Sequence, residues 1–188
     1  MPDFDRRRPI DETIWGIDGV FDRETCESFI TRFESQGFER APITTASGPV
    51  MNDRVRNNER LMFDDPAMAQ SLFERVKSAL PEHIDAWKVC GLNERFRVYR
   101  YDVGQRFRPH FDGCFMREYD REESALTLMV YLNDGFEGGE TAFLDYGVVV
   151  KPKQGNVLVF FHPILHEGRS VLSGRKYVLR TDVMYRRE

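Results

Sequence analysis

The stretch "RPHFDGCF" (108–115) contains a histidine and an aspartate two residues apart, His110 and Asp112. In an extended strand, residues two apart project from the same face, so we expect this imidazole and this carboxylate to point together. Nitrogen and carboxylate oxygen ligands on one face supply two adjacent positions around a divalent metal ion. The pair is weak evidence by itself, because polar residues are also common where a strand ends.

A third ligand has to come from a distant part of the chain. His166 lies in "FFHPILHEG", directly after the strongly apolar strand pattern "NVLVFF". Two histidines and one carboxylate on one side of a metal leave its other positions open, which suits non-haem Fe(II), whereas a structural zinc site is closed by four ligands. His110, Asp112 and His166 are therefore the predicted metal ligands, with a simple turn histidine as the alternative for His166.

The remaining histidines have other interpretations. His162 precedes Pro163, which favours an extended turn at that point. We interpret His162 as a residue that supports the site or serves the fold alone. His83, close to Pro81, is expected at the solvated surface.

A 2-oxo acid bound at such a metal needs a cation for its distal carboxylate. Lys176 opens the strand pattern "KYVLRTDVMY" (176–185), in which Lys176, Val178 and Arg180 alternate onto one face. A buried cation there requires an anionic partner, and Lys176 is the predicted anchor. An exposed, charged outer face is the alternative for this strand, and the neighbouring Arg175 is the rival for the anchor role.

Two helices are expected to brace these strands. Asp22 is a suitable N-cap for a helix over 23–36, which Gly37 ends. A second helix follows "DDP" and stops at Pro81. The apolar face of the first contains Cys26, Phe29, Ile30 and Phe33, and that of the second contains Ala69, Leu72, Phe73, Val76 and Leu80. The polar segment 44–60 between them predicts a long loop.

From residue 94 the pattern becomes that of short strands separated by Gly, Pro and Asn turns. Strands are expected over 95–101, 125–132, 140–144, 148–150, 156–161 and 176–185. The predicted fold class is mainly β with bracing helices (α+β), an antiparallel jelly roll in one domain spanning 1–188. Its helical support region is 1–93 and its β core is 94–186.

Composition excludes several functional classes. The 188 residues carry a net charge of -4 and 41% hydrophobic residues, with no apolar run long enough to span a membrane. No global attraction to nucleic acid is expected from that charge. Three scattered cysteines and an N-terminus without an apolar signal region predict a reducing compartment, the cytoplasm. We expect a monomer or a weak dimer.

Three segments together resemble a known family. They are "YRYDVGQRFRPHFD", "MVYLNDGFEGGETAF" and "VLVFFHPILHEGRSVLSGRKYVLRTDVMY". They resemble the prolyl 4-hydroxylase-like branch of the Fe(II)/2-oxoglutarate-dependent dioxygenases over roughly 94–186. The resemblance implies a double-stranded β-helix, a cupin-like jelly roll, that holds Fe(II) through His110, Asp112 and His166.

The same resemblance implies how 2-oxoglutarate is bound. Its 1-carboxylate and 2-oxo group would bind the metal, and its 5-carboxylate would pair with Lys176 and the hydroxyl of Tyr131. Tyr101 matches a tyrosine that reaches the metal end of this co-substrate, and Thr141 is a further contact. Many relatives have arginine at the position of Lys176. Halogenating relatives have a small residue at the position of Asp112, so its carboxylate favours hydroxylation.

The implied reaction consumes O₂ and 2-oxoglutarate, releases succinate and CO₂, and hydroxylates an unactivated C–H bond. The substrate is expected to be a peptidyl or free amino acid, with proline as a candidate. Two alternatives stay open: a dioxygenase of another small metabolite or a nucleobase, and a jelly-roll protein that binds a metal without catalysis.

Three residues are candidates for contacting the substrate. Arg180 shares the inward face of its strand with Lys176 and is the first of them. Arg56 and Asn58, in the polar segment 50–60, are the others. The segment 113–124 is expected to act as a lid over the entrance.

Overall fold

A large antiparallel sheet is the centre of the fold in the computed structural model, which describes residues 7–45, 47–117 and 121–188. Its strands lie in the order β1 (Arg7–Asp11), β2 (Ile14–Ile17), β16 (Val157–Phe161), β12 (Glu122–Tyr131), β19 (Lys176–Arg187), β9 (Arg95–Tyr101), β6 (Glu59–Asp64) and β3 (Glu39–Arg40). At one end β11 (Met116–Arg117) pairs with β12, β8 (Trp87–Leu92) pairs with β19, and β7 (His83–Ile84) pairs with β8.

A smaller sheet covers part of one face of the large sheet. It contains, in order, β10 (Phe107–His110), β17 (His166–Gly168), β14 (Thr141–Phe143) and β15 (Val148–Val150). Two short antiparallel pairs complete the described strands: β13 (Glu137–Gly138) with β18 (Val171–Ser173), and β4 (Ile43–Thr45) with β5 (Gly48–Val50).

Strand alternation gives the large sheet two different buried faces. On β19, Tyr177, Leu179 and Val183 belong to a core shared with the helices. The intervening side chains of β19, including Val178, face the smaller sheet instead. Because both faces are covered, most side chains of β19 and β12 are buried, including polar ones of β19 such as Lys176, Arg180 and Asp182.

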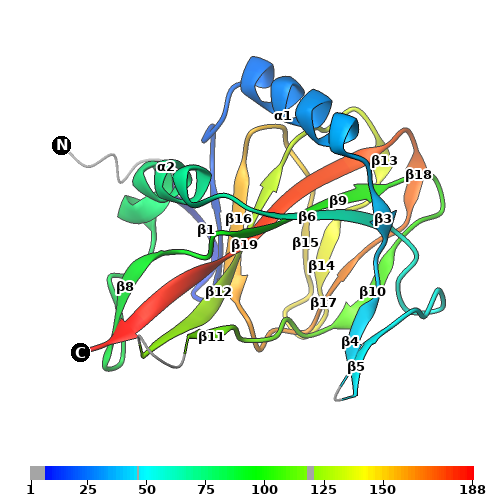
Figure 1. Cartoon of the computed structure of the whole chain (residues 1–188). Helices are drawn as coiled ribbons and strands as arrows, with labels where there is room; N and C mark the ends of the chain where they lie inside the picture. Colours follow the sequence, from blue (N-terminus) through cyan, green and yellow to red (C-terminus); the bar gives the residue numbers. More distant parts are fainter. Residues whose placement is uncertain (1–6, 46, 118–120) are drawn as a thin grey trace.

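The helices close the other face of the large sheet. In Figure 1, α1 (Arg23–Gln36) runs along the top and α2 (Pro66–Val76) lies at the upper left, with β14, β15 and β17 further down. Asp22 and Asp65 cap the two helices by accepting hydrogen bonds from backbone amides, and a 3₁₀ turn, η2 (Lys77–Ala79), extends α2. Phe33 and Leu72 are buried in the shared core. Neither helix is long and apolar enough to cross a membrane.

The predicted fold class is confirmed, and the positions of both helices are those expected. The first half of the chain, however, contains more strand than its pattern indicated, because β2 and β6 are completed by partners far along the chain, β16 and β9. The predicted loop 44–60 likewise includes the β4–β5 pair and the start of β6. Within the predicted lid 113–124, residues 118–120 lie outside the described residues, and β11 and the start of β12 occupy part of the rest.

Candidate metal centre

The register between β10 and β17 places His110 opposite His166. We expected His110 and Asp112 to project from the same face of one strand. In the structure β10 ends at His110, and Asp112 lies two residues beyond the end of the strand. Its Oδ1 lies 3.9 Å from Nε2 of His110, and its Oδ2 lies 3.6 Å from Nε2 of His166. One ligand atom from each of the three residues lies within 4.8 Å of the others, the one such cluster found in the described part of the chain.

Both imidazoles are oriented by the backbone. Nδ1 of His110 lies 2.7 Å from the carbonyl of Arg108, and Nδ1 of His166 lies 2.9 Å from the carbonyl of Ile164. A carbonyl only accepts, so each Nδ1 carries the hydrogen and each Nε2 keeps its lone pair for a metal. The rings are also held by packing, since Phe107 stacks on His110 at 3.4 Å between centroids and Phe160 contacts His166.

Burial and charge give the three groups the protonation states that a metal ion needs. Burial lowers the pKa of His110 to about 3, and it also lowers the pKa of His166. Burial alone would raise the pKa of Asp112, but the guanidinium of Arg180 and the two imidazoles outweigh it and hold that pKa well below its usual range. Two neutral imidazoles therefore face one ionised carboxylate at neutral pH.

This donor set fits Fe(II). Two imidazole nitrogens and one carboxylate on one side of a metal are the facial arrangement of non-haem iron sites, and no cysteine belongs to the cluster. The three ligands border a pocket between the two sheets, which leaves room for further ligands on the pocket side. His110, Asp112 and His166 would hold the ion.

The same pocket contains the predicted co-substrate anchor. Lys176, Thr141 and Tyr101 line it together with the three candidate ligands. The ammonium of Lys176 donates a hydrogen bond of 2.6 Å to the carbonyl of Gly139 and lies 5.1 Å from the ring centroid of Tyr101. Tyr131 stands behind the lining, where its hydroxyl shares a hydrogen bond of 2.8 Å with Thr141.

Arg175, the rival for the anchor role, points elsewhere. It is exposed and pairs with Asp102 and Tyr177 outside the pocket. Lys176, by contrast, is 2% exposed. Of the two cations, the structure places Lys176 in the pocket.

The glycines of "GGET" shape the turn beside Lys176. Gly138 and Gly139 both have positive φ, 72° and 66°. A Cβ atom on Gly138 would lie 2.4 Å from the carbonyl oxygen of Ser170. Because this oxygen belongs to the backbone, it cannot move aside as a flexible side chain could, and the position requires glycine. This turn directs the carbonyl of Gly139 at the lysine.

The three candidate substrate residues occupy different places. Arg180 lines the pocket, but its guanidinium lies 3.2 Å from Asp112 and 3.0 Å from Asp182, so two carboxylates already balance its charge. Arg56 lies behind the wall, between the rings of Tyr99 and Phe107 at 4.4 Å and 4.3 Å. Its Nε donates to Asn58, which is also buried. A role of these residues in substrate binding stays a prediction.

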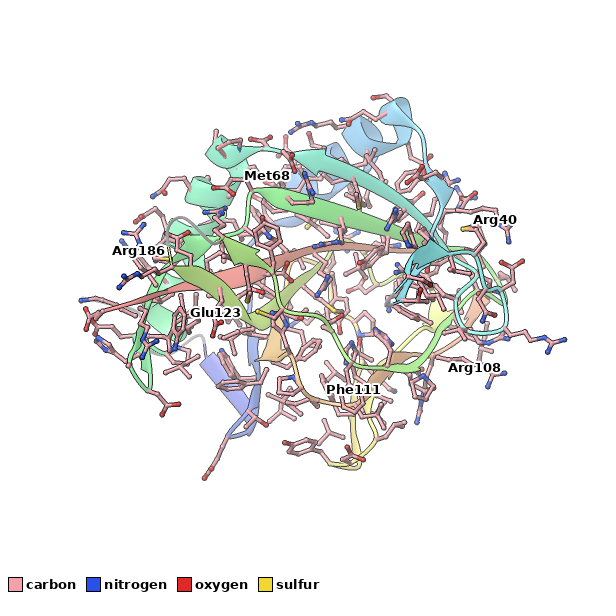
Figure 2. The ribbon with its side chains drawn as sticks, turned by 60° about the horizontal axis from the view of Figure 1, so that its bottom comes forward. Arg40, Met68, Arg108, Phe111, Glu123 and Arg186 are labelled. Atoms are coloured by element: carbon pink, nitrogen blue, oxygen red, sulfur yellow. The ribbon has the colours of Figure 1, made fainter. Side chains whose placement is uncertain are left out.

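Several pocket residues were missed by the sequence interpretation. Tyr99 and Met129 line the pocket, and Phe107 forms its wall beside His110. Tyr99 and Met129 share strand faces with Tyr101 and Tyr131, two residues further on, so alternation could have identified them. Figure 2, which views the molecule from below, shows the segment with Arg108 and Phe111 running across the near surface, where both side chains are exposed.

The remaining histidines lie where expected. His162 is buried beside Ser124 and Thr127, close to the triad without belonging to it. His83 is exposed and lies near Glu188.

Comparison with known proteins identifies the family. Residues 96–181 match the sequence profile described as the 2OG-Fe(II) oxygenase superfamily, and this range contains all three candidate ligands and Lys176. The segment 96–181 of this chain belongs to the 2OG-Fe(II) oxygenase superfamily. The resemblance seen in the sequence is thereby confirmed.

Curated relatives of this oxygenase chain are named as prolyl 4-hydroxylases. "Prolyl 4-hydroxylase 2" of Arabidopsis thaliana is 31% identical over 54% of this chain and 46% of its own length. "Probable prolyl 4-hydroxylase 3" of the same plant is 29% identical over 82% of this chain and 63% of its own length. The chain thus spans less than two thirds of the length of these relatives.

Solved structures share the fold of this oxygenase chain. The viral collagen prolyl hydroxylase of Paramecium Bursaria Chlorella virus-1 has a TM-score of 0.65 at 24% identity, covering 93% of this chain and 97% of that one. A Pseudomonas putida prolyl-4-hydroxylase has a TM-score of 0.62 at 18% identity, covering 94% and 93%. At these identities the likeness concerns the fold alone.

Proposed function

We propose that this protein is an Fe(II)- and 2-oxoglutarate-dependent dioxygenase that hydroxylates an unactivated C–H bond and releases succinate and CO₂. One observation carries the proposal: His110, Asp112 and His166 face the same pocket as Lys176, a buried ammonium without a carboxylate partner among the described residues. A metal site and a cation at separate points of one pocket suit a co-substrate with a chelating end and a distal carboxylate.

Different residues of the pocket would bind the metal and the co-substrate. His110 and His166 present Nε2, and Asp112 presents a carboxylate oxygen, to the metal. Lys176 supplies the positive charge for the distal carboxylate, and Thr141 lines the pocket next to it. Bound Fe(II), with O₂ and 2-oxoglutarate, supplies the oxidising power for the C–H bond. The apolar lining, including Met129 and Val178, keeps water from the reacting centre.

For the substrate we propose a peptidyl or free amino acid, with prolyl residues first among the candidates. The names of the curated relatives support this choice. The ligand set itself is common to many substrates, so it does not separate an amino acid from another small metabolite or a nucleobase. We also propose that the protein works in a reducing compartment, the cytoplasm, because Cys26, Cys90 and Cys114 are free thiols.

The first test concerns the metal and the co-substrate. Under anaerobic conditions, Fe(II) and 2-oxoglutarate added to the wild-type protein should give a visible metal-to-ligand charge-transfer band. We expect His166→Ala to abolish the band and Lys176→Met to weaken it at limiting 2-oxoglutarate. A wild-type protein without the band would count against an oxygenase and favour a non-catalytic metal-binding jelly roll.

The second test concerns the substrate. Prolyl peptides, free amino acids, other metabolites and nucleobases are incubated aerobically with enzyme, Fe(II) and 2-oxoglutarate, and succinate is measured beside the mass of each candidate. We expect a mass gain of one oxygen in a prolyl peptide or amino acid, in step with succinate. A gain confined to a nucleobase or an unrelated metabolite would contradict the substrate proposal and leave the reaction type standing.

A further inference from the structure

Four buried polar side chains outside the metal triad form a connected group behind Asp112. They are Ser124, Thr127, His162 and Arg180, each less than 10% exposed, and they come from β12, from the residue after β16 and from β19. Buried polar groups are normally hydrogen-bonded, so the donors and acceptors in this group can be assigned.

The hydroxyl of Thr127 determines which groups in this hydrogen-bonded group donate and which accept. An ionised carboxylate only accepts, so the hydroxyl of Thr127 donates to Oδ2 of Asp112 at 2.6 Å. Its oxygen accepts from the guanidinium of Arg180 at 3.2 Å, and it lies 3.1 Å from Nδ1 of His162. A hydroxyl has one hydrogen, already given to Asp112, so Nδ1 of His162 must carry the hydrogen and donate.

The other nitrogen of His162 completes the chain. Burial lowers the pKa of His162 and favours the neutral ring, whose Nε2 then accepts. Nε2 lies 2.8 Å from the hydroxyl of Ser124, which donates to it. The oxygen of Ser124 in turn accepts the backbone N–H of Phe115 at 2.8 Å. Hydrogen bonds thus run in one direction from Phe115 to Asp112, and His162 is the middle link.

These hydrogen bonds connect both ends of the segment 112–115, which begins with the candidate metal ligand Asp112. Residues 111–114 have no strand pairing, and Phe115 is held by one backbone hydrogen bond, which its carbonyl accepts from the N–H of Ser124 at 2.9 Å. Thr127 holds the segment at Asp112, Ser124 holds it at Phe115, and His162 joins the two. Within the described residues, the hydroxyl of Thr127 and the guanidinium of Arg180 both approach Oδ2, which also lies 3.6 Å from Nε2 of His166, while Oδ1 lies 3.9 Å from Nε2 of His110.

We propose that His162 is a positioning residue for Asp112, acting through Thr127 to hold the carboxylate in its place beside the two imidazoles that would bind the metal. The inference rests on the metal site of the proposed function. Of the two roles that the sequence left open for His162, support of the site and service to the fold alone, it assigns the first. Partners of this kind behind a metal ligand typically contribute 10–100-fold to metal affinity, as an order of magnitude.

Two substitutions at His162 distinguish its hydrogen bond with Thr127 from its hydrogen bond with Ser124. The amide nitrogen of asparagine reaches about as far as Nδ1 of histidine, so His162→Asn keeps a donor for Thr127. The longer glutamine reaches about as far as Nε2, so His162→Gln keeps only the contact with Ser124. We expect His162→Gln to lower the Co(II) affinity of the metal-free protein about 10–100-fold and His162→Asn to lower it less.

Substitutions at Thr127 test the link itself. Thr127→Val keeps the shape and removes the hydroxyl, and we expect a loss of Co(II) affinity as large as that of His162→Gln. Thr127→Ser restores the hydroxyl and should restore the affinity. Thr181→Val is the matched control, because Thr181 is also fully buried but donates to the carbonyl of Asn93, outside the triad. It should lower stability without changing Co(II) affinity.

Metal binding is measured by competition with a chromophoric chelator, on proteins whose folding is checked by circular dichroism and thermal melting without metal. Equal Co(II) affinity in wild type, His162→Gln and Thr127→Val would overturn the positioning role while leaving the metal site intact. So would equal losses in Thr127→Val and Thr181→Val, since they would indicate a general effect of stability. If the wild-type protein bound no Co(II), the result would contradict the metal site of the proposed function, and the positioning role of His162 would fail with it.

Discussion

The ammonium of Lys176 donates to the carbonyl of Gly139 at 2.6 Å, and no carboxylate of the described residues forms an ion pair with it. Burial lowers the pKa of Lys176 to about 7, against a smaller opposing effect of Glu140. The pocket therefore contains a cation whose charge is only partly present at neutral pH. A bound carboxylate would supply the counter-charge that the protein itself leaves out.

The affinity for 2-oxoglutarate should consequently depend on pH. Below about pH 7 Lys176 is already charged, and the affinity should be at its highest. Above that value, binding requires the uptake of a proton, so the affinity should fall by up to about tenfold per pH unit. Isothermal titration of the metal-free protein with 2-oxoglutarate between about pH 6 and about pH 9, in buffers of different ionisation enthalpy, would measure both the affinity and the proton uptake.

Lys176→Arg is the matched control for that titration. Arginine stays charged across this range, so its affinity profile should be flat and its binding should take up no proton. If the wild-type affinity were also flat from pH 6 to 9, Lys176 would not be the residue whose protonation accompanies binding.

The same lysine should reduce stability in the absence of 2-oxoglutarate. Its pKa is 10.5 when unfolded and about 7 when folded, so below about pH 7 the folded protein carries the full cost of a buried ammonium. Lys176→Met should be more stable than wild type, by a few kcal/mol as an order of magnitude, in that range. The advantage should shrink as pH rises toward 10.5. Urea unfolding at about pH 6 and about pH 9 checks this, and an advantage that grows with pH would contradict it.

Gly138 should tolerate no side chain. It has a φ of 72°, and a Cβ there would lie 2.4 Å from the carbonyl oxygen of Ser170. Gly138→Ala should cost more than about 1 kcal/mol and weaken 2-oxoglutarate binding, because the turn that presents the carbonyl of Gly139 must shift. Gly135→Ala, in open space without positive φ, should change neither property. Thermal melting and 2-oxoglutarate titration of both variants provide the comparison, and equal behaviour would show that the turn is not constrained.

Arg180 should matter for folding as well as for the site. It is the cation between Asp112 and Asp182, and both carboxylates bind Nη2. Arg180→Met would leave the buried carboxylate of Asp112 without a cation, while Asp182 keeps its ion pair with Arg97, and should cost about 3–5 kcal/mol at neutral pH. Although burial opposes it, Arg180 lowers the pKa of Asp112 below 3.8, so the loss should diminish below about pH 4, where that carboxyl becomes protonated in the unfolded state. Urea unfolding at about pH 7 and about pH 3 measures this, and a loss that is the same at both would point to packing alone.

The substrate-binding interpretation of Arg180 makes a separate prediction. Arg180→Lys keeps a cation but loses the planar fork, so it should raise KM for an anionic or carbonyl-bearing substrate while folding is largely retained. Once a substrate is found, unchanged KM and unchanged coupling of succinate to product in Arg180→Lys and Arg180→Ala would leave Arg180 with the role of holding Asp112 only.

Much of the candidate site could be predicted from single stretches of sequence. Asp22 and Gly37 marked the first helix because capping depends on neighbouring residues. The alternation of 176–180 put Lys176 and Arg180 on one face because the strand period is two. The hairpin β4–β5 and the pairing of β6 with β9 were missed, since such short strands carry little periodicity and are completed by their partners.

The sequence by itself determined the chemical identity of the ligands, the cation that opens β19 and the fold class, because residue types and local periodicity express them. Only the tertiary structure decided which residues surround Asp112. The opposition of His110 and His166 depends on the register of β10 with β17, and the link from His162 through Thr127 depends on the register of β12 with β16. Register is set by packing between strands far apart in the chain, and no local pattern encodes it.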